Sequence, residues 1–286
     1  MHFPFKAFVD GSYCKSNPVL VIQKENIMPG DFRVTLADID QIKNCPDADV
    51  VHVVGLQQDT FDYFVKTYGK QFKAISLANI SPVKDLSLLG TLPQLEYLRL
   101  SVNHKTSLLW NMEGNISLTG LCLEDFTKLS SIREIRTAPA LRELDISNHM
   151  WMTMVIDSFK PLSGMRIERL AFNGKAIADN DLSFVEHLPN LKSFDFPTNM
   201  FTTDQVACIV ANFPQVEGYA LKAMFDCMLL DSNENRVLVP HVMIIGKRKP
   251  ALKIQGNEKR IQKYLDNFEK LKAQYRGVPY KEAFSL

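Results

Sequence analysis

Hydrophobic positions recur through the middle of the chain at a spacing of about 23 residues. The most complete unit places Leu95, Leu98, Leu100 and Asn103 in the pattern L-x-x-L-x-L-x-x-N. The apolar skeleton of this unit occurs eight times, starting at Val51, Phe72, Leu95, Leu118, Leu141, Ile167, Leu191 and Val216, in steps of 21, 23, 23, 23, 26, 24 and 25 residues. Alternating apolar positions are typical of short strands, so each unit predicts one strand.

Repeated strands of this kind predict a parallel sheet. In the third unit Leu98 and Leu100 point to one face, and Tyr97 and Arg99 point to the other. One strand cannot bury its apolar face alone, so successive units must stack and run in the same direction. We therefore expect two inward columns, one of Ile75, Leu98, Leu121, Leu144, Leu170, Phe194 and Tyr219, the other of Leu77, Leu100, Leu123, Ile146, Phe172, Phe196 and Leu221.

The segments between the strands predict short helices or 3₁₀ turns. Residues 59–68 carry apolar side chains at helical spacing and are followed by Gly69 as a stop signal. Residues 181–187 begin with a capping aspartate, and residues 203–213 give the clearest helical pattern. A proline stands two residues before the next unit in four places, at Pro93, Pro139, Pro189 and Pro214, where it ends the helix.

The chain resembles the leucine-rich-repeat superfamily from about residue 50 to residue 224, because repeats of this length and motif are the signature of that superfamily. The resemblance implies an α/β solenoid with a parallel sheet on its concave face and short helices or 3₁₀ turns on its convex face. We divide the chain into an N-terminal cap (1–48), a solenoid (49–227) and a C-terminal cap (228–286).

The ninth motif position varies between the repeats. In the superfamily an asparagine there binds backbone groups of the following turn. Only Asn103 and Asn199 match, with Asp59 as a partial substitute. The other units hold Ile80, Phe126, His149, Lys175 and Met224. We therefore expect irregular turns.

The two predicted caps carry no repeat register. Residues 19–22 and 32–34 are typical of short strands. Residues 242–246 resemble residues 51–55 and indicate a ninth strand of the solenoid. Residues 258–275 place Ile261, Leu265, Phe268 and Leu271 on one stripe, which predicts an amphipathic helix that closes the last repeat.

Charge is spread unevenly along the chain. The net charge is +1, but residues 246–276 contain ten basic and three acidic residues, so this segment carries +7 and the remainder −6. We interpret the segment as a solvated cap helix. The alternative is a basic patch for nucleic acid or for an acidic partner. Aromatic residues do not alternate with these charges as in single-strand binders, so a nucleic-acid partner is disfavoured.

Composition predicts an ordinary globular protein, with 46% hydrophobic and 23% charged residues. The first residues lack the layout of a signal peptide, and no apolar run reaches the roughly 18 residues of a membrane helix. Five scattered cysteines without a C-x-x-C pair argue against disulfides and zinc sites. We expect a cytoplasmic protein without metal or cofactor.

The concave face is where proteins of this superfamily usually bind partners. Motif positions three, five and seven project there. A tyrosine and arginines beside carboxylates are typical of protein-binding hot spots, whereas the alternative is a hydrated face with locally neutralised charges. We expect the partner-binding surface to comprise Tyr97, Arg99, Ser101, Cys122, Glu124, Glu143, Asp145, Arg169 and Asp195.

Residues 149–154 follow the fifth predicted strand in the longest unit and combine histidine, methionines and Trp151. Extra residues at this point predict a loop at the rim, and methionine and tryptophan suit adaptable binding surfaces. The simpler interpretation packs Trp151 into the convex core, and we favour it.

Catalytic motifs are not evident. Cys122, Asp145 and His149 could serve as nucleophile, orienting group and base, but we expect His149 to face inward and Cys122 outward. The sequence contains no H-E-x-x-H or G-x-S-x-G motif. It therefore predicts a non-enzymatic module that binds a protein partner on its concave face. The alternative function is an inhibitor or immunity-type protein that blocks a partner enzyme.

Overall fold

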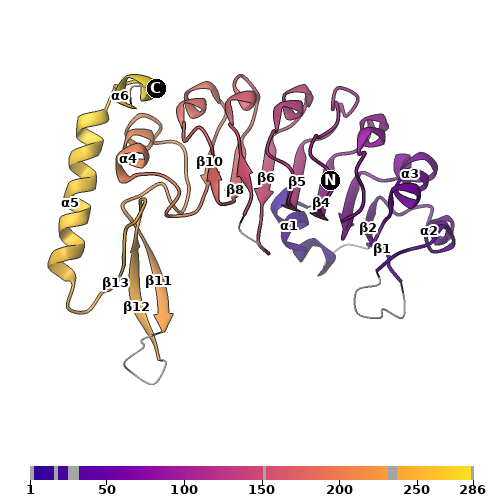
Figure 1. Ribbon diagram of the computed structural model, residues 1–286, viewed down its shortest axis with the longest axis horizontal. Coiled ribbons are helices and arrows are strands. Elements are labelled where there is room, and N and C mark those ends of the chain that lie inside the picture. The colour runs from indigo at the N-terminus through magenta and orange to yellow at the C-terminus, as the bar shows by residue number, and fades with distance from the viewer. Residues whose placement is uncertain (1–2, 16–18, 25–31, 151–152, 231–236, 285–286) are drawn as a thin grey trace.

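The computed structural model describes residues 3–15, 19–24, 32–150, 153–230 and 237–284. Figure 1 shows an arch with strands on its inner, concave side and helices and turns on its outer, convex side. Eight parallel strands form an open sheet in the order β1-β2-β3-β4-β5-β6-β8-β10. They are β1 (Leu20–Ile22), β2 (Val50–Val54), β3 (Ala74–Ala78), β4 (Tyr97–Asn103), β5 (Gly120–Phe126), β6 (Glu143–Ser147), β8 (Arg169–Asn173) and β10 (Ser193–Asp195).

The strand register confirms the predicted apolar columns from β3 to β10, but the first predicted unit begins three residues too late, because Val51 and Val53 pair with Ile75 and Leu77. Leu98 pairs with Ile75 on one side and with Leu121 on the other. The ladder continues from Leu121 through Leu144 and Leu170 to Phe194. Every member of this column is at most 1% exposed. Stacking identical positions on top of one another thus buries the apolar face that no single strand could bury.

The eighth predicted unit does not form a strand. Residue 217 touches β10 through one isolated bridge to Ser193, and Tyr219 is 38% exposed. At Gly218 a Cβ would lie 2.2 Å from the Phe194 carbonyl oxygen, and a turn closes from Leu221 N–H to the Gly218 oxygen. The chain therefore turns away from the sheet at this point. The eighth strand is β1 at the other end, where residues 20–22 confirm one of the two predicted N-terminal strands, while 32–34 form none.

The predicted ninth parallel strand is also wrong. Residues 242–244 belong to β12 (Leu238–Ile244), which pairs antiparallel with β11 (Met224–Leu230) and β13 (Ala251–Lys253). This three-stranded sheet projects from one end of the arch (Figure 1). Antiparallel neighbours need only a short connection, whereas a parallel strand needs a long crossover. The local hairpin therefore prevails over the resemblance to residues 51–55.

The return segments follow the predictions closely. Residues 59–68 and 203–213 form α3 (Gln58–Thr67) and α4 (Thr203–Asn212), each to within one residue. The predicted segment 181–187 forms the shorter 3₁₀ turn Ser183–His187. The other convex elements are α2 (Leu36–Ile39), the 3₁₀ turns Asp40–Asn44, Gly69–Gln71, Ser87–Thr91, Arg133–Thr137 and Lys160–Leu162, and the parallel pair β7 (Val155–Ile156) and β9 (Ala176–Ile177).

One of the two predicted motif asparagines acts as expected. The Asn103 amide is buried, donates to the oxygens of Ile80 and Val83, and accepts the N–H groups of residues 105 and 106. Asn199 is exposed, so its predicted role is wrong. Asn148, one position earlier than expected in its unit, is buried and accepts the N–H groups of residues 153 and 154.

The turns at the ends of β3, β4 and β5 are more regular than the variable ninth position predicts. The residue before that position adopts left-handed backbone in three successive units, with φ of 50° at Asn79, 57° at Val102 and 55° at Asp125. A shared backbone conformation therefore holds these turns alike even where the motif asparagine is missing.

The predicted C-terminal helix is confirmed as α5 (Glu258–Tyr275), followed by α6 (Tyr280–Phe284). Both pack beside α4 at the end of the arch (Figure 1). Phe268 and Tyr280 are at most 2% exposed, and Gln205 of α4 donates to the Tyr280 hydroxyl at 2.7 Å. The apolar stripe of α5 thus contacts the last helix of the convex side.

Candidate functional site on the concave face

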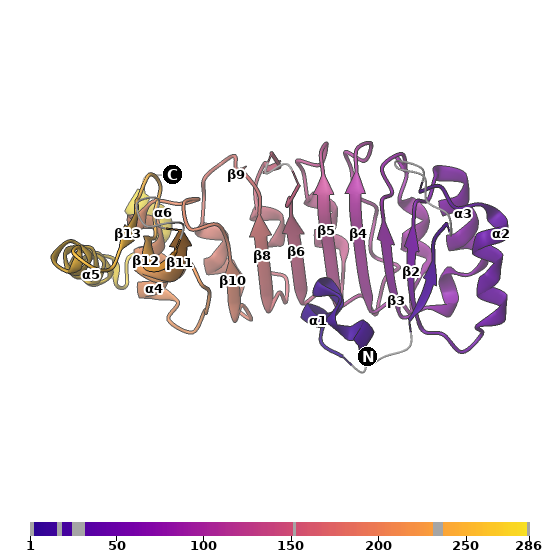
Figure 2. The same ribbon diagram turned by 90° about the horizontal axis from the view of Figure 1, so that it is seen from below.

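The N-terminal helix α1 (Phe5–Asp10) lies on the concave face and not at the end of the sheet. Figure 2 shows it in front of the starts of β4 and β5. Phe5 and Phe8 are each 1% exposed and pack with Tyr13 against Val50, Ala74 and Cys122. Val50 and Ala74 are the first residues of β2 and β3, as Tyr97 is of β4. The helix therefore covers the starts of neighbouring strands.

Tyr97 and Gly120 receive this helix. The Tyr97 ring centroid lies 5.4 Å from that of Phe5 and 5.8 Å from that of Phe8. A Cβ on Gly120 would lie 2.2 Å from Cδ2 of Phe5, well inside van der Waals contact. The absence of a side chain at the first residue of β5 is thus what admits the Phe5 ring. The sequence signal for this contact is Gly120 itself, a glycine that stands at motif position three between Tyr97 and Glu143 of the neighbouring units.

Three of the predicted binding residues are buried or half-buried. Cys122 is 0% exposed and Ser101 is 6% exposed, so neither is open to a partner, and Tyr97 is half-buried beneath α1. Burial raises the pKa of the Cys122 thiol well above its usual value, and the charges of Asp145 and Glu124 add to this effect. The prediction that Cys122 belongs to an exposed surface is wrong, because an aromatic cluster occupies the space above it.

Arg99 and Glu124 form an ion pair between β4 and β5. Both side chains are largely buried, at 23% and 14% exposed. His149 is 58% exposed, and its Nε2 lies 3.9 Å from Oε1 of the same glutamate. The expectation that His149 faces inward is therefore wrong. Its Nδ1 lies 3.1 Å from the amide of Asn173, so the ring sits on the rim of the concave face.

The uncovered part of the concave face carries an acidic strip, which we define as Glu124, Glu143, Asp145 and Asp195. The strand register places Glu143 beside Arg169 and Asp145 beside Cys122. Asp195 accepts the backbone N–H of Tyr219 at 3.2 Å. Four carboxylates face two arginines, Arg99 and Arg169, so this surface has an excess of two negative charges.

Asp145 has an unusual environment within the strip. Burial raises its pKa to about 6, and the charge of Glu124 adds to the increase, although Arg169 opposes it. Burial likewise raises the pKa of Glu143, against the effect of Arg169. Among the residues that the structure describes, Asp145 has neither a hydrogen bond nor a salt bridge. Its carboxylate is thus partly desolvated without a direct partner.

The rim loop predicted around Trp151 stays a prediction. Trp151 lies outside the described residues, although its neighbour Met154 is 4% exposed and Met150 is 63% exposed. In the described ranges no group of three His, Cys, Asp or Glu side chains could hold a metal ion. Nor does any helix there have the length and apolarity to cross a membrane.

No protein-family model matches the chain, and no curated protein matches it significantly.

Proposed function

We propose that this protein is a leucine-rich-repeat solenoid that binds a partner protein through the acidic strip, and that the partner contributes a basic side chain. The repeat register, the stacked apolar columns and the buried Asn103 support the solenoid assignment. Scaffolds of this kind do not specify their partners, so the chemistry of the face must supply the rest of the argument.

The observation that carries the proposal is the unpaired carboxylate of Asp145. A raised pKa means that the ionised form is disfavoured where it stands, and its first cause is burial. A lysine or arginine delivered by a partner would lie between Asp145 and Glu143, two groups whose pKa values are both raised. The positive charge of the partner would favour the ionised forms of both carboxyl groups, and this electrostatic attraction would contribute to the affinity.

A catalytic role is disfavoured by the same geometry. The Cys122 thiol lies beneath Phe5 with a raised pKa, the opposite of the exposed, acidified thiol of a nucleophilic cysteine. The neighbouring carboxylates would also repel phosphates, so this face suits a basic protein segment better than nucleic acid. Free cysteines at four described positions fit a reducing, cytoplasmic location.

The test compares three immobilised proteins in a native lysate: wild type, Glu143→Gln with Asp145→Asn, and Asp47→Asn. Asp47 is exposed and lies before β2, away from the strip, so its variant controls for the loss of a negative charge. We expect one protein, identified by mass spectrometry, to be retained by wild type and by the control. The double variant should retain it at least about tenfold less, equivalent to about 1.4 kcal/mol.

Equal retention by all three proteins would remove the acidic strip from the binding site. If the captured partner is an enzyme, its activity should be measured with and without the purified protein. Stoichiometric loss of that activity would identify the protein as an inhibitor, whereas unchanged activity would identify it as an adaptor.

A further inference from the structure

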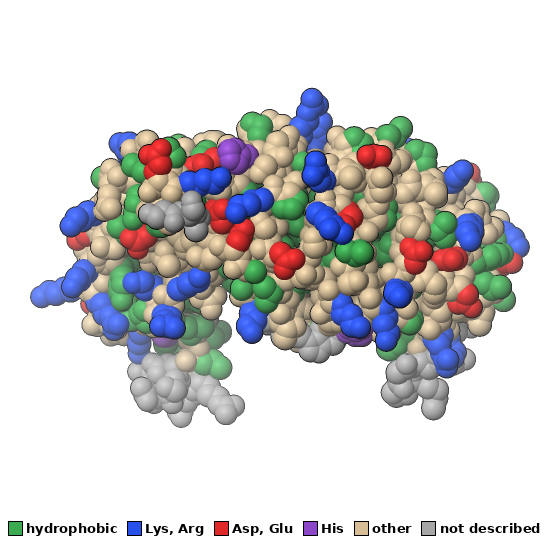
Figure 3. Space-filling model, turned by 45° about the horizontal axis from the view of Figure 1, so that its top comes forward, with side chains coloured by type: hydrophobic (Ala, Val, Ile, Leu, Met, Phe, Trp, Pro, Cys, Tyr) green, Lys and Arg blue, Asp and Glu red, His purple; other side chains and the backbone are tan. Residues whose placement is uncertain are grey.

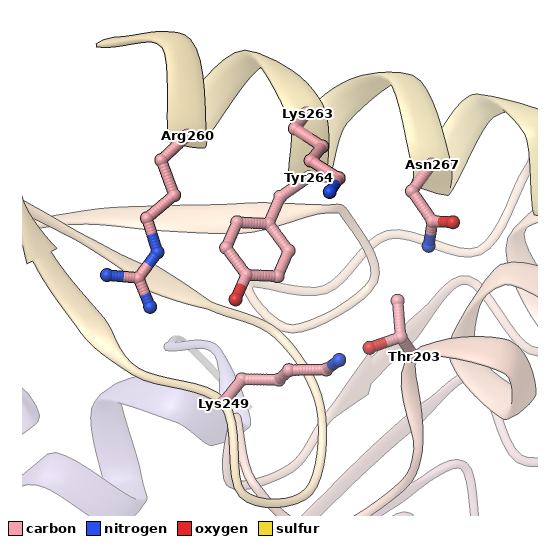
Figure 4. Close-up of a pocket in the computed structure, with 6 residues that line it drawn as sticks. All are labelled: Thr203, Lys249, Arg260, Lys263, Tyr264 and Asn267. Atoms are coloured by element: carbon pink, nitrogen blue, oxygen red, sulfur yellow. The ribbon is translucent and has the colours of Figure 1, made fainter. Parts of the chain in front are cut away.

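A second site lies at the C-terminal end of the arch, where α5 packs beside α4. It is a pocket of about 390 Å³ lined by Thr203, Lys249, Arg260, Lys263, Tyr264 and Asn267. Figure 4 shows side chains from α5 directed toward Lys249 and Thr203 across the pocket. This volume falls in the range of small-molecule sites. The pocket shares no residue with the acidic strip.

Helical spacing brings the α5 residues together. Lys263 and Tyr264 stand three and four residues after Arg260, and Asn267 stands three residues after Tyr264, so the four share one face of the helix. That face carries two cations, an aromatic ring and an amide. Ile261 and Phe268 lie on the neighbouring stripe and hold the helix against the protein.

The third cation is placed by a tight turn. Gly246 has φ of 136°, and a Cβ there would lie 2.4 Å from Oγ1 of Thr203. The missing side chain lets the turn after β12 rest on the start of α4. The Lys249 N–H closes this turn on the Gly246 oxygen at 3.3 Å, and the Lys249 ammonium lies 5.7 Å from the centre of the Tyr264 ring.

The three cations lack acidic partners. Lys249, Arg260 and Lys263 form no salt bridge with any residue in the described part of the chain. The acidic residues of α5 are engaged elsewhere: Glu258 accepts the Gly256 N–H, Asp266 accepts from Gln262, and Glu269 pairs with Lys272. Figure 3 shows basic side chains gathered at the end where α5 lies, while both signs mix over the remainder of that face.

We infer that this pocket binds a multiply charged phosphate group. Three cations around one cavity favour an anion with more than one negative charge, and an arginine presents paired donors that match phosphate oxygens. The N-terminus of α4, a helix of ten residues that begins at the pocket residue Thr203, adds the favourable end of its dipole. The Asn267 amide supplies a further donor. The group could belong to a free polyphosphate or to a phosphoinositide head group, which share this chemistry.

The experiment is calorimetric titration of the full chain with inorganic pyrophosphate at about 50 mM salt, beside co-sedimentation with vesicles containing phosphatidylinositol 4,5-bisphosphate. The test variants are Arg260→Gln and Lys263→Gln, separately and together. Lys259→Gln is the matched control, because Lys259 adjoins Arg260 in α5, is exposed and does not line the pocket. Circular dichroism checks that each variant keeps its helical content.

We expect saturable binding of at least one of the two phosphates, weakened at least about tenfold in the double variant and less than about twofold in the control. Binding of pyrophosphate would indicate a soluble ligand, and binding of vesicles alone a lipid head group. The inference fails if neither phosphate binds. It also fails if Lys259→Gln weakens binding as much as Arg260→Gln does, because a diffuse basic field would then explain the affinity.

Discussion

Replacing Gly120 with alanine tests whether the N-terminal helix is held by a specific contact on the concave face. The new Cβ would lie 2.2 Å from one ring atom of Phe5 and 2.6 and 2.7 Å from two others. Ordinary contact begins near 3.4 Å, so the ring must withdraw by about 1 Å. The ring is 1% exposed and has Phe8 and Tyr97 as neighbours, so it has little room to move.

The expected change in the free energy of unfolding depends on whether the Phe5 ring is present. Gly120→Ala should cost about 1–3 kcal/mol, the usual penalty for an added methyl in a packed core. Phe5→Ala alone should cost about 3–5 kcal/mol, or less if α1 detaches as a unit. In the Phe5→Ala background the methyl meets an empty space. There Gly120→Ala should be neutral or stabilising by about 0.5–1 kcal/mol, since alanine suits a strand better than glycine.

The assay is a double-mutant cycle by urea unfolding, followed by circular dichroism. The expected coupling between the two positions is about 1–3 kcal/mol. Costs that add to within about 0.5 kcal/mol would show that Phe5 does not pack on Gly120. Phe3→Ala is a useful comparison, because Phe3 joins the same aromatic cluster and is not among the atoms nearest to the added Cβ.

Three further outcomes are expected from urea or thermal unfolding. Burial raises the pKa of Asp145 from 3.8 to about 6, so the folded state binds that proton more tightly. The stability of the wild type should therefore fall progressively as pH rises from about 4 to about 6, where the carboxylate becomes ionised. The stability of Asp145→Asn relative to wild type should increase by about 1–3 kcal/mol between about pH 4 and about pH 7.5. Asn103→Ala should cost about 2–4 kcal/mol by leaving backbone groups unpaired, whereas Asn199→Ala should cost under about 0.5 kcal/mol; similar costs would contradict this difference in role. Deletion of residues 257–286 removes α5 with the buried Phe268 and should cause aggregation, and a monomeric truncation with unchanged melting would refute this.

The parallel sheet was predictable because each inward residue has an equivalent neighbour one repeat away. Leu98 meets Ile75 and Leu121 for no other reason than the 23-residue spacing. The same logic fails at the last unit, where the pattern from Val216 is present but Gly218 approaches the Phe194 carbonyl and the chain turns away. A periodic pattern does not record the local contact that ends it.

The placement of α1 could not be predicted for a different reason. Phe5 and Phe8 belong to a helix of six residues without a repeat register, and their partner Tyr97 is about 90 residues further along the chain. Nothing local encodes that distance. The matching feature on the sheet is Gly120, which has no side chain. In a sequence, such a glycine cannot be distinguished from any other small residue on a hydrated face.

The position of α1 in turn defines what kind of partner the concave face can accept. The helix covers the starts of β2 to β5, where the first residues are Val50, Ala74, Tyr97 and Gly120. The starts of the next two strands, β6 and β8, are Glu143 and Arg169, which stay partly open. An apolar surface is thus covered by the chain itself, whereas a charged one stays partly open. Binding to this face should therefore weaken as salt rises, because the contacts that remain available are ionic.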